Sequence, residues 1–351
     1  MKIYKIALLP GDGIGPEVCG VAVKILQKIE KNFPIKFEIA EKKIGGAAIE
    51  KFDEPLPRET LQCCENSDAI LFGSVGDPKF DGAKIRPETA ILDLRKYFNF
   101  FANIRPAGVQ KNLRDFSPLK NEIIGDGFYF KIVRELCGGI YFGKKISAKN
   151  FAADEMKYEK FEIERIARVA FNLAKNSAQK KVTNIDKANV LATSKFWRKI
   201  IAEIRAKEFP EIALENLFID NATMQILKNP KNFSIILTAN LFGDILSDEA
   251  AQISGSIGMS ASASLNEKNF GLFEPIGGSA PDIAGKNVAN PIAQIFSAKM
   301  MLEHFGEFSA AEKIAAAVDS TLKKFRTPDI FVPGTEKIST QKMGDEIAAR
   351  I

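Results

Sequence analysis

The chain has 351 residues, of which 46% are hydrophobic and 26% are charged, a composition typical of globular proteins with a large buried core. Its 49 basic and 44 acidic residues are intermixed and give a net charge of +5, which argues against nucleic-acid or membrane-surface binding. No apolar run approaches the ~18 residues of a membrane span or forms a signal-peptide core. We therefore expect a cytoplasmic protein of about two domains.

The first elements are a strand over residues 3–9 and a helix over 16–31, joined by the turn Gly11-Asp-Gly-Ile-Gly15. Pro16 suits a first helical position. The glycine spacing invites a dinucleotide-binding interpretation, but proline stands where that motif needs its third glycine for close helix packing. We therefore do not predict a Rossmann fold.

Residues 68–73 predict a second strand, and a helix follows over 88–98. Four residues of this helix share one face by their three- and four-residue spacing: Glu88, Ile91, Leu92 and Arg95. A surface helix could carry the two charges at the edges of its apolar stripe. Alternatively, an apolar recess beside a guanidinium would suit a branched alkyl group attached to a carboxylate.

Strand-like and helix-like segments continue to alternate through the middle of the chain, which favours an α/β protein. No Pro- or Ser-rich linker separates them, as expected if the chain crosses twice between two domains. Residues 135–160, rich in Gly, Lys and Ala, predict an irregular arm. The extended segments are 100–104 and 128–134, and the helical segments are 161–176 and 194–207.

Two arginines, Arg105 and Arg134, stand at the ends of strand-like segments. The planar guanidinium pairs bidentately with a carboxylate, although each arginine alone also suits a structural ion pair. Tyr141 lies in a glycine-rich segment where the backbone is permissive.

Lys187 and Asp220 also follow strand-like segments, over residues 181–185 and 214–219. A lysine at such a position can have a lowered pKa and act as a general base. The only histidine, His304, is expected at the surface or at a helix end. Acid–base chemistry therefore has to use Lys, Tyr, Asp or Glu.

Asp244 and Asp248 are four residues apart, directly after the apolar segment 233–238. A helix there would place both carboxylates on one face, where their repulsion costs roughly 0.2–0.5 kcal/mol on an exposed surface and more in a half-buried segment. A divalent cation such as Mg²⁺ or Mn²⁺ would resolve the repulsion. The alternative is an acidic first turn that the helix dipole favours.

The later loop Gly277-Gly-Ser-Ala-Pro-Asp-Ile-Ala-Gly285 is the better candidate for a nucleotide site. Its small residues allow close backbone approach to an adenosine, and Asp282 could accept hydrogen bonds from ribose hydroxyls. It could equally be an ordinary turn. The cysteines have no zinc or redox spacing, and we expect them to be packing residues in a reducing cytosol: Cys19, Cys63, Cys64 and Cys137.

Six segments in order along nearly the whole chain resemble the β-decarboxylating dehydrogenase family of isocitrate and isopropylmalate dehydrogenases, and its 3-isopropylmalate branch in particular. The resemblance implies NAD-dependent oxidative decarboxylation of 3-isopropylmalate to 4-methyl-2-oxopentanoate and CO₂ in leucine biosynthesis. No step of that reaction requires histidine. The segments are 9–17, 101–106, 133–143, 186–190, 240–248 and 274–290.

The resemblance also implies a two-domain isopropylmalate/isocitrate dehydrogenase-like fold with a large mixed sheet. Residues 1–99 and 255–351 would form the first domain with the cofactor loop. Residues 100–254 would form the second domain, with the metal site, the arm and the interface of a homodimer. In this family the active sites are shared, and the partner subunit supplies the counterparts of Lys187 and Asp220.

Residue by residue, the resemblance assigns a role to each motif position. Tyr141 and Lys187 match the catalytic pair, and the metal ligands would be Asp220, Asp244 and Asp248. The substrate-binding positions would be Glu88, Ile91, Leu92, Arg95, Arg105, Arg134, Val190 and Asp220. The NAD-binding positions would be Gly277, Gly278, Ser279, Ala280, Asp282, Ile283 and Asn290.

Specificity follows from two of these groups. The additional carboxylate of isocitrate would lie unpaired against Ile91 and Leu92, and Asp282 would repel the 2′-phosphate of NADP. The sequence departs from the family at Gly277, where many members have histidine, so NAD affinity could be weaker. It also departs at Ala192, in place of a frequent glutamate, and at Glu155, in place of threonine.

Two alternatives remain open at this point. One is another enzyme of the family that acts on tartrate, malate or isocitrate. The other is a non-catalytic regulatory subunit that keeps the fold and binds nucleotide or hydroxy-acid ligands. Such a subunit would be expected to have lost part of the Arg, Tyr, Lys and Asp set, but every member is present here.

Overall fold

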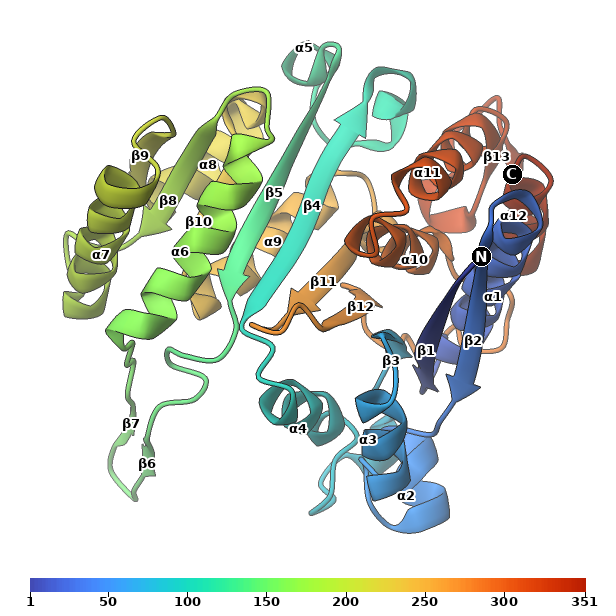
Figure 1. Cartoon of the computed structure of the whole chain (residues 1–351), viewed down its shortest axis with the longest axis horizontal. Coiled ribbons are helices and arrows are strands. Elements are labelled where there is room, and N and C mark those ends of the chain that lie inside the picture. Colours follow the sequence, from blue (N-terminus) through green and yellow to red (C-terminus); the bar gives the residue numbers. More distant parts are fainter. The chain divides into compact units, whose positions relative to one another are not determined.

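A computed structural model describes the backbone of residues 1–351 and the side chains at all positions except 111 and 112. The chain divides into two compact units (Figure 1). The first unit combines Met1–Asn99 with Gly255–Ile351, and the second unit is the continuous segment Phe100–Ser254. Both contain a mixed sheet covered by helices, so the predicted α/β class is confirmed.

The first unit draws its elements from both ends of the chain. From the N-terminal part come β1 (Lys2–Gly11), α1 (Gly15–Asn32), β2 (Ile35–Glu41), α2 (Gly46–Phe52), α3 (Arg58–Glu65), β3 (Ala69–Ser74) and α4 (Thr89–Tyr97). From the C-terminal part come β11 (Ala261–Leu265), β12 (Gly271–Pro275), α10 (Ile292–His304), α11 (Phe308–Leu322), β13 (Phe325–Arg326), β14 (Glu336–Lys337) and α12 (Thr340–Ala348).

The main strands of the first unit follow the order β2-β1-β3-β12-β11, and all neighbours are parallel except β11 and β12. Every residue of β3 is buried, as expected for a parallel strand with both faces covered. Helix α1 buries a stripe at helical spacing that includes Val18, Ala22, Ile25 and Ile29, and it packs with α10 and α12 (Figure 1).

The glycine turn between β1 and α1 docks against the loop that begins at Gly277. The Ile14 N–H donates to the Ser279 carbonyl oxygen at 2.8 Å. Gly13 has a positive φ of 60°, and a Cβ there would lie 2.0 Å from the same oxygen. The glycine therefore serves close backbone contact within the protein, and with the mixed strand order this confirms that the fold is not a Rossmann fold.

The second unit is built from one continuous stretch of chain. Its strands are β4 (Ala102–Gln110), β5 (Gly127–Glu135), β6 (Lys145–Ser147), β7 (Ala152–Asp154), β8 (Lys181–Asp186), β9 (Ala213–Phe218) and β10 (Ile235–Thr238). Its α-helices are α5 (Asn121–Ile124), α6 (Lys160–Lys175), α7 (Ala192–Glu208), α8 (Ile219–Lys228) and α9 (Asn240–Ile253).

The main strands of the second unit follow the order β4-β5-β10-β8-β9, with β4 antiparallel to β5 and the others parallel. Helices α6 and α7 cover one face and α8 and α9 the other (Figure 1). The core between the sheet and α8 and α9 contains Phe130, Ile132, Ile236 and Leu246. Arg134 stands at the carboxyl end of β5, and the adjacent strand β10 ends shortly before α9, which carries Asp244.

Most predicted elements are confirmed within two or three residues, and the structure corrects two predictions. The arm 135–160 is not wholly irregular, because β6 and β7 form an antiparallel ribbon that projects from the second unit (Figure 1). Its strands are exposed on both faces, so they lack the alternation that identifies a strand. Asp220 lies in the first turn of α8 rather than at a strand end.

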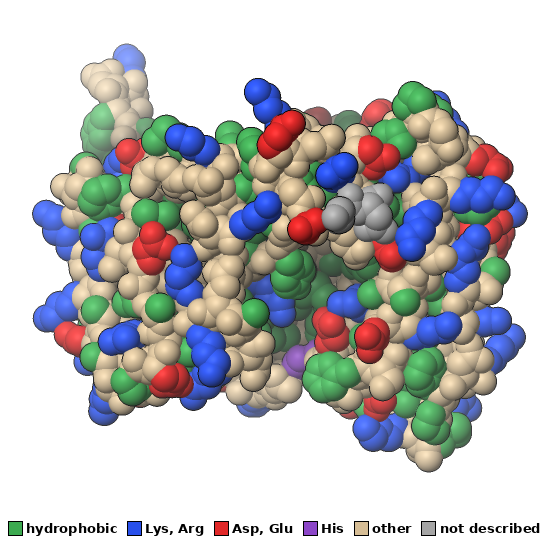
Figure 2. Space-filling model, turned by 90° about the horizontal axis from the view of Figure 1, so that it is seen from above, with side chains coloured by type: hydrophobic (Ala, Val, Ile, Leu, Met, Phe, Trp, Pro, Cys, Tyr) green, Lys and Arg blue, Asp and Glu red, His purple; other side chains and the backbone are tan. Residues whose placement is uncertain are grey.

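The surface agrees with the predicted charge pattern. Figure 2 shows Lys and Arg side chains interspersed with Asp and Glu on the face that it presents. None of the helices in the described part of the chain is both long and apolar enough to cross a membrane. The four cysteines are free, and His304 is the last residue of α10, which confirms its expected helix-end position.

The core of the second unit gives a stability prediction. Phe130 is fully buried on β5, whereas its neighbour Tyr129 points to the other face and is 60% exposed. Phe130→Ala should lower the free energy of unfolding by about 3–5 kcal/mol, because it leaves a cavity among packed side chains. Urea unfolding monitored by circular dichroism measures the loss. Tyr129→Ala is the matched control, and an equal loss in both variants would contradict the assigned core.

Candidate active site

An ion-pair network joins β5 to the first turn of α9. Arg134, at the end of β5, is 3% exposed. Its Nη1 donates to Asp244 Oδ1 at 2.5 Å, and its Nε and Nη2 donate to Asn240 Oδ1 at 3.0 and 2.8 Å. The Asn240 amide is fixed in turn, because its Nδ2 donates to the Gly138 carbonyl oxygen at 3.0 Å. The guanidinium plane is therefore held by a neutral amide on one side and a carboxylate on the other.

Gly243 explains how the arginine reaches this position. A Cβ at Gly243 would lie 2.6 Å from Arg134 Cγ and 2.8 Å from its Cβ, so the arginine stem crosses α9 where that helix has no side chain. Any larger residue at position 243 would displace the arginine, since contacts this short do not occur between real side chains.

Arg105, on β4, approaches the same face of α9. Its Nε donates to Asn103 Oδ1 at 2.6 Å and its Nη1 to Ser247 Oγ at 2.7 Å. Nη1 also lies 3.5 Å from Asp248 Oδ1 and 3.9 Å from Asp244 Oδ1. The structure thus brings the predicted Arg105, Arg134, Asp244 and Asp248 together in the second unit, with both aspartates on one face of α9 as their spacing predicted.

Tyr141 joins this cluster from the glycine-rich loop after β5. Its hydroxyl donates to Asp244 Oδ2 at 2.9 Å, and the Arg134 guanidinium carbon lies 5.9 Å from its ring centroid. Partial burial raises the pKa of Tyr141 above its ordinary value, and the hydrogen bond to the Asp244 carboxylate raises it further. The phenol is therefore protonated at neutral pH and available as a proton donor.

The chemistry of the two aspartates suits a hard dication. Partial burial raises the pKa of Asp248 above its ordinary value, against the opposing effect of Arg105, and the neighbouring Asp244 charge raises it further. A cation between the carboxylates would relieve that repulsion. Among the described residues, however, no group of three His, Cys, Asp or Glu side chains within one chain could hold a metal ion.

Lys187 and Asp220 form a separate pair in the second unit. Lys187 Nζ donates to Asp220 Oδ1 at 2.6 Å, and this hydrogen bond lowers the pKa of Asp220. The described contacts of neither residue include Asp244 or Asp248, so one chain does not gather the three predicted metal ligands. Asp186 anchors the turn that carries Lys187, because its carboxylate accepts from Arg198 at 2.9 and 2.7 Å. Val190, in the same turn, is 64% exposed.

The predicted substrate face of α4 belongs to the first unit. Arg95 Nη2 donates to Glu274 Oε1 at 2.9 Å, and both side chains are largely buried. Glu88 pairs with Arg86 at 3.1 Å. Leu92 is 48% exposed and Ile91 is half-buried, so an apolar surface stands beside a largely buried guanidinium.

A cavity of about 200 Å³ in the first unit is bounded by much of the predicted nucleotide loop. Five predicted cofactor-binding residues line it, whereas Ser279 contacts Ile14 through its carbonyl and Asp282 is exposed with its side chain in solvent. The other walls come from α1, the end of β3, the segment after α9 and the first turns of α10. The five residues are Gly277, Gly278, Ala280, Ile283 and Asn290.

Several residues in these clusters were missed from the sequence. Asn240 could have been identified as a candidate site residue, since it stands directly between a buried strand and an amphipathic segment. Gln294 could also have been identified, because it is a polar residue within the apolar run 292–295. No local sequence pattern identifies the other three residues as partners of the arginines, because only folding brings them together: Glu274, Asn103 and Ser247.

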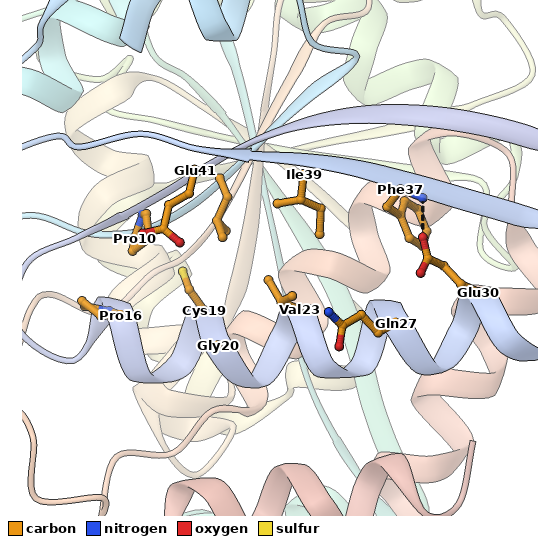
Figure 3. Close-up of a pocket in the computed structure, with 11 residues that line it drawn as sticks. Pro10, Pro16, Cys19, Gly20, Val23, Gln27, Glu30, Phe37, Ile39 and Glu41 are labelled. Carbon is orange, nitrogen blue, oxygen red and sulfur yellow. Dashed lines mark hydrogen bonds between the residues drawn. The ribbon is translucent and has the colours of Figure 1, made fainter. Parts of the chain in front are cut away.

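A larger groove lies elsewhere on the first unit, between α1 and β2 (Figure 3). Its walls include Cys19, Val23 and Ile39, and Glu30 accepts a hydrogen bond from the Phe37 N–H at 2.6 Å. None of the predicted site residues lines it. It is therefore not the candidate active site.

Comparison with known proteins places these clusters in a family. A sequence model of the family described as isocitrate/isopropylmalate dehydrogenase matches residues 5–347. A 3-isopropylmalate dehydrogenase of Clostridium pasteurianum is 50% identical over 360 residues, which cover 100% of both chains. Another, from Buchnera aphidicola subsp. Rhopalosiphum padi, is 54% identical over 357 residues, covering 99% of this chain and 98% of that protein.

Solved structures share the fold at lower identity. The crystal structure of isocitrate dehydrogenase from Methylococcus capsulatus aligns with a TM-score of 0.87 and 35% identity over 99% of both chains. A β-decarboxylating dehydrogenase from Thermococcus kodakarensis aligns with a TM-score of 0.81 and 35% identity, over 99% of this chain and 96% of that one.

The Tyr141–Asp244 hydrogen bond can be tested by titration. Asp244→Asn should lower the pKa of Tyr141, because the negative charge that opposes tyrosinate formation is removed. Tyrosinate absorbance against pH measures the change, and the difference from an added Tyr141→Phe substitution isolates this tyrosine. Asp248→Asn is the control and should produce a smaller fall, since Asp248 acts on Tyr141 only through its charge. An unchanged or higher pKa in Asp244→Asn would contradict the described contact.

Proposed function

This chain belongs to the isocitrate/isopropylmalate dehydrogenase family, and from that premise we propose that it catalyses the NAD-dependent oxidative decarboxylation of 3-isopropylmalate. The products are 4-methyl-2-oxopentanoate and CO₂, in leucine biosynthesis. The observation that carries the proposal is the 50–54% identity, over essentially full length, to enzymes named 3-isopropylmalate dehydrogenase.

Arg95, Arg105 and Arg134 are proposed to bind the substrate carboxylates. The amides of Asn103 and Asn240 orient two of these guanidinium groups without adding negative charge to that of Asp244 and Asp248. A dication between the two aspartates would offset their charge and leave the guanidinium groups able to attract an anion. Bidentate pairing of a fixed guanidinium with a carboxylate supplies direction as well as affinity. Glu88 and Val190 are proposed to complete the substrate contacts.

Ile91 and Leu92 are proposed to receive the isopropyl group. Neither side chain offers a hydrogen-bond donor, so the additional carboxylate of isocitrate would be desolvated without a partner there. Discrimination of this kind, by an unpaired polar group, is stronger than discrimination by a missing methylene.

Lys187 and Tyr141 are proposed to move the protons. Lys187 would take the proton of the C2 hydroxyl as hydride leaves C2, and ionised Asp220 holds its Nζ in place through the 2.6 Å hydrogen bond. Tyr141, kept protonated by its raised pKa, would give a proton to C3 after CO₂ departs. Separate residues thus serve as base and acid.

NAD and a dication would supply the remaining chemistry, NAD by accepting the hydride and Mg²⁺ or Mn²⁺ by acidifying the hydroxyl and stabilising negative charge after decarboxylation. Asp244 and Asp248, with Asp220, fit the oxygen ligands that such ions prefer. The cavity beside Gly277 fits the adenosine end of NAD, since a Cβ at Gly278 would have nothing within 4 Å and the backbone there is open. Ser279 and exposed Asp282 would complete the cofactor contacts, with Asp282 at the ribose hydroxyls.

The proposed assembly is a cytoplasmic homodimer in which each active site uses both subunits. Lys187 and Asp220 form a pair apart from Asp244 within one chain, which supports their donation to a neighbouring site. The two compact units are proposed to be the two domains expected from the resemblance, with the metal site and the dimer interface in the second.

The reaction can be tested with four substrates: 3-isopropylmalate, isocitrate, malate and tartrate. NADH absorbance should rise fastest with 3-isopropylmalate, because the apolar face of α4 disfavours a further charge. EDTA should abolish the reaction, and excess Mg²⁺ or Mn²⁺ should restore it. Equal or faster turnover of isocitrate would defeat the substrate assignment, and no turnover of any substrate would favour a regulatory subunit.

The shared active site can be tested by subunit complementation. Lys187→Ala and Asp244→Ala should each be inactive alone, because one removes the base and the other a metal ligand. When equal amounts are unfolded and refolded together, half of the dimers are mixed and each has one intact site of two, so activity should return to about a quarter of wild type. The control mixes Tyr141→Phe with Asp244→Ala. This mixture would leave an intact site only if Tyr141 and Asp244 of one site came from different subunits.

Failure of Lys187→Ala and Asp244→Ala to complement, with each variant dimeric and folded, would contradict the shared site. The structure places Tyr141 and Asp244 in contact within one chain. In the mixed Tyr141→Phe and Asp244→Ala dimer each site therefore contains one altered residue, so mixing should not raise the activity above that of the two separate variants. The double variant Tyr141→Phe/Asp244→Ala mixed with wild type keeps one intact site in each mixed dimer and calibrates the measurement.

A further inference from the structure

A buried side-chain amide in the first unit has no hydrogen-bond partner. Gln294, in the first turn of α10, has 0% exposure, and neither its Nε2 nor its Oε1 meets a hydrogen-bonding group. Buried polar atoms are nearly always paired, because leaving them unpaired costs free energy on folding. Two orphaned atoms on one side chain therefore call for an explanation other than stability.

Gln294 lines the cavity of about 200 Å³ beside Gly277. The other polar side chains described in its lining are already engaged. Ser74 Oγ donates to the Asp12 carbonyl oxygen at 2.9 Å, Ser256 Oγ donates to Asp329 Oδ2 at 2.6 Å, and Asn290 Nδ2 donates to the same oxygen at 3.0 Å. Among the side chains described in the lining, the Gln294 amide therefore keeps both a hydrogen-bond donor and an acceptor that it can offer to a ligand.

We propose that Gln294 reads the adenine base of the bound dinucleotide, an inference that rests on the NAD-dependent function proposed above. The amide presents a donor beside an acceptor, and an adenine edge presents the complementary pair, a ring nitrogen beside the exocyclic amino group. The remaining lining is mainly apolar or small, as suits the faces of a planar base, and includes Ile14, Val18, Ile257 and Ala293. The cavity is smaller than the ~300–1,000 Å³ typical of sites for whole drug-sized ligands, so it suits one part of the dinucleotide.

The position of the cavity identifies which end of NAD it receives. Its wall includes Ala280 and Ile283, which flank Asp282, the residue proposed to accept hydrogen bonds from the ribose hydroxyls. The base attached to that ribose enters the cavity, and the Gln294 amide then replaces the water that the base loses. Gln294 is therefore a specificity-determining residue for the base.

Replacement of the amide by an apolar chain of similar length separates this role from a structural one. In Gln294→Met, the ligand-free protein loses two unpaired polar atoms and should have a higher unfolding temperature. The same variant should bind NAD at least tenfold more weakly. A residue needed only for packing would show the opposite sign for stability.

The decisive measurement is base discrimination, by isothermal titration calorimetry with NAD and with nicotinamide hypoxanthine dinucleotide. At the edge that Gln294 would read, adenine presents the ring nitrogen N7 as an acceptor beside its amino group, whereas hypoxanthine presents N7 beside a carbonyl oxygen. Two acceptors mismatch a side-chain amide in either of its orientations, because the amide has one donor side and one acceptor side. Wild type should prefer NAD by at least tenfold, and Gln294→Met should reduce the preference to below about twofold. Gln27→Met, at an exposed position of α1, is the matched control and should leave the preference unchanged.

An unchanged preference in Gln294→Met would overturn the inference, and so would a preference already absent in wild type. Weakened binding of nicotinamide mononucleotide in Gln294→Met would also overturn it, by assigning the amide to the other end of NAD. NADH formation from 3-isopropylmalate by wild type tests the proposed function separately. An active enzyme with an unaltered base preference in Gln294→Met would sink this inference alone.

Discussion

The candidate catalytic cluster depends on one carboxylate, that of Asp244. One of its oxygens accepts from Arg134 and the other from Tyr141, so a single side chain joins the end of β5, the loop after it and the start of α9. Arg134 is almost fully buried, and a buried guanidinium without a counter-charge is strongly destabilising. The contact between Asp244 and Arg134 is therefore required by the local fold, and the same carboxylate also holds the Tyr141 hydroxyl in place.

The two arginines beside this carboxylate are held in a common manner. Each has a neutral asparagine amide as a fixed partner, Asn103 for Arg105 and Asn240 for Arg134. A carboxylate in the place of either amide would orient the guanidinium equally well but would add a further negative charge beside it. An amide fixes the plane through hydrogen bonds and adds no negative charge to that of Asp244 and Asp248, which already lie beside the two guanidinium groups.

Much of the fold could be predicted from the sequence because its strands and helices keep clear periods. The stripe on α1 repeats every three to four residues, and the parallel strands are continuous apolar runs. Asp220 was misplaced because strand β9 ends only two residues earlier, and the helix that follows is recognisable only from the buried Ala222 and Ile226. The ribbon of β6 and β7 is exposed on both faces and leaves no periodic signal.

The candidate site could be predicted as a set of residue types but not as a set of partners. Asp244 and Asp248 were expected on one helical face, and they lie there. That Arg95 pairs with Glu274 could not be predicted, because their contact joins positions far apart in sequence. Single sequences report local periods directly, whereas long-range pairs are fixed only by the packing of the whole core.

The discontinuous first unit has a consequence for how the nascent chain folds. β1 is synthesised well before the groups that complete its surroundings. Tyr4 stacks on Phe305 with ring centroids 4.3 Å apart, and the Ile14 N–H donates to the Ser279 carbonyl oxygen. The second unit, by contrast, is one uninterrupted stretch whose strands pair among themselves. During synthesis the second unit can therefore complete its core before the C-terminal helices emerge. Until then the apolar faces of β1 and α1 remain exposed to solvent.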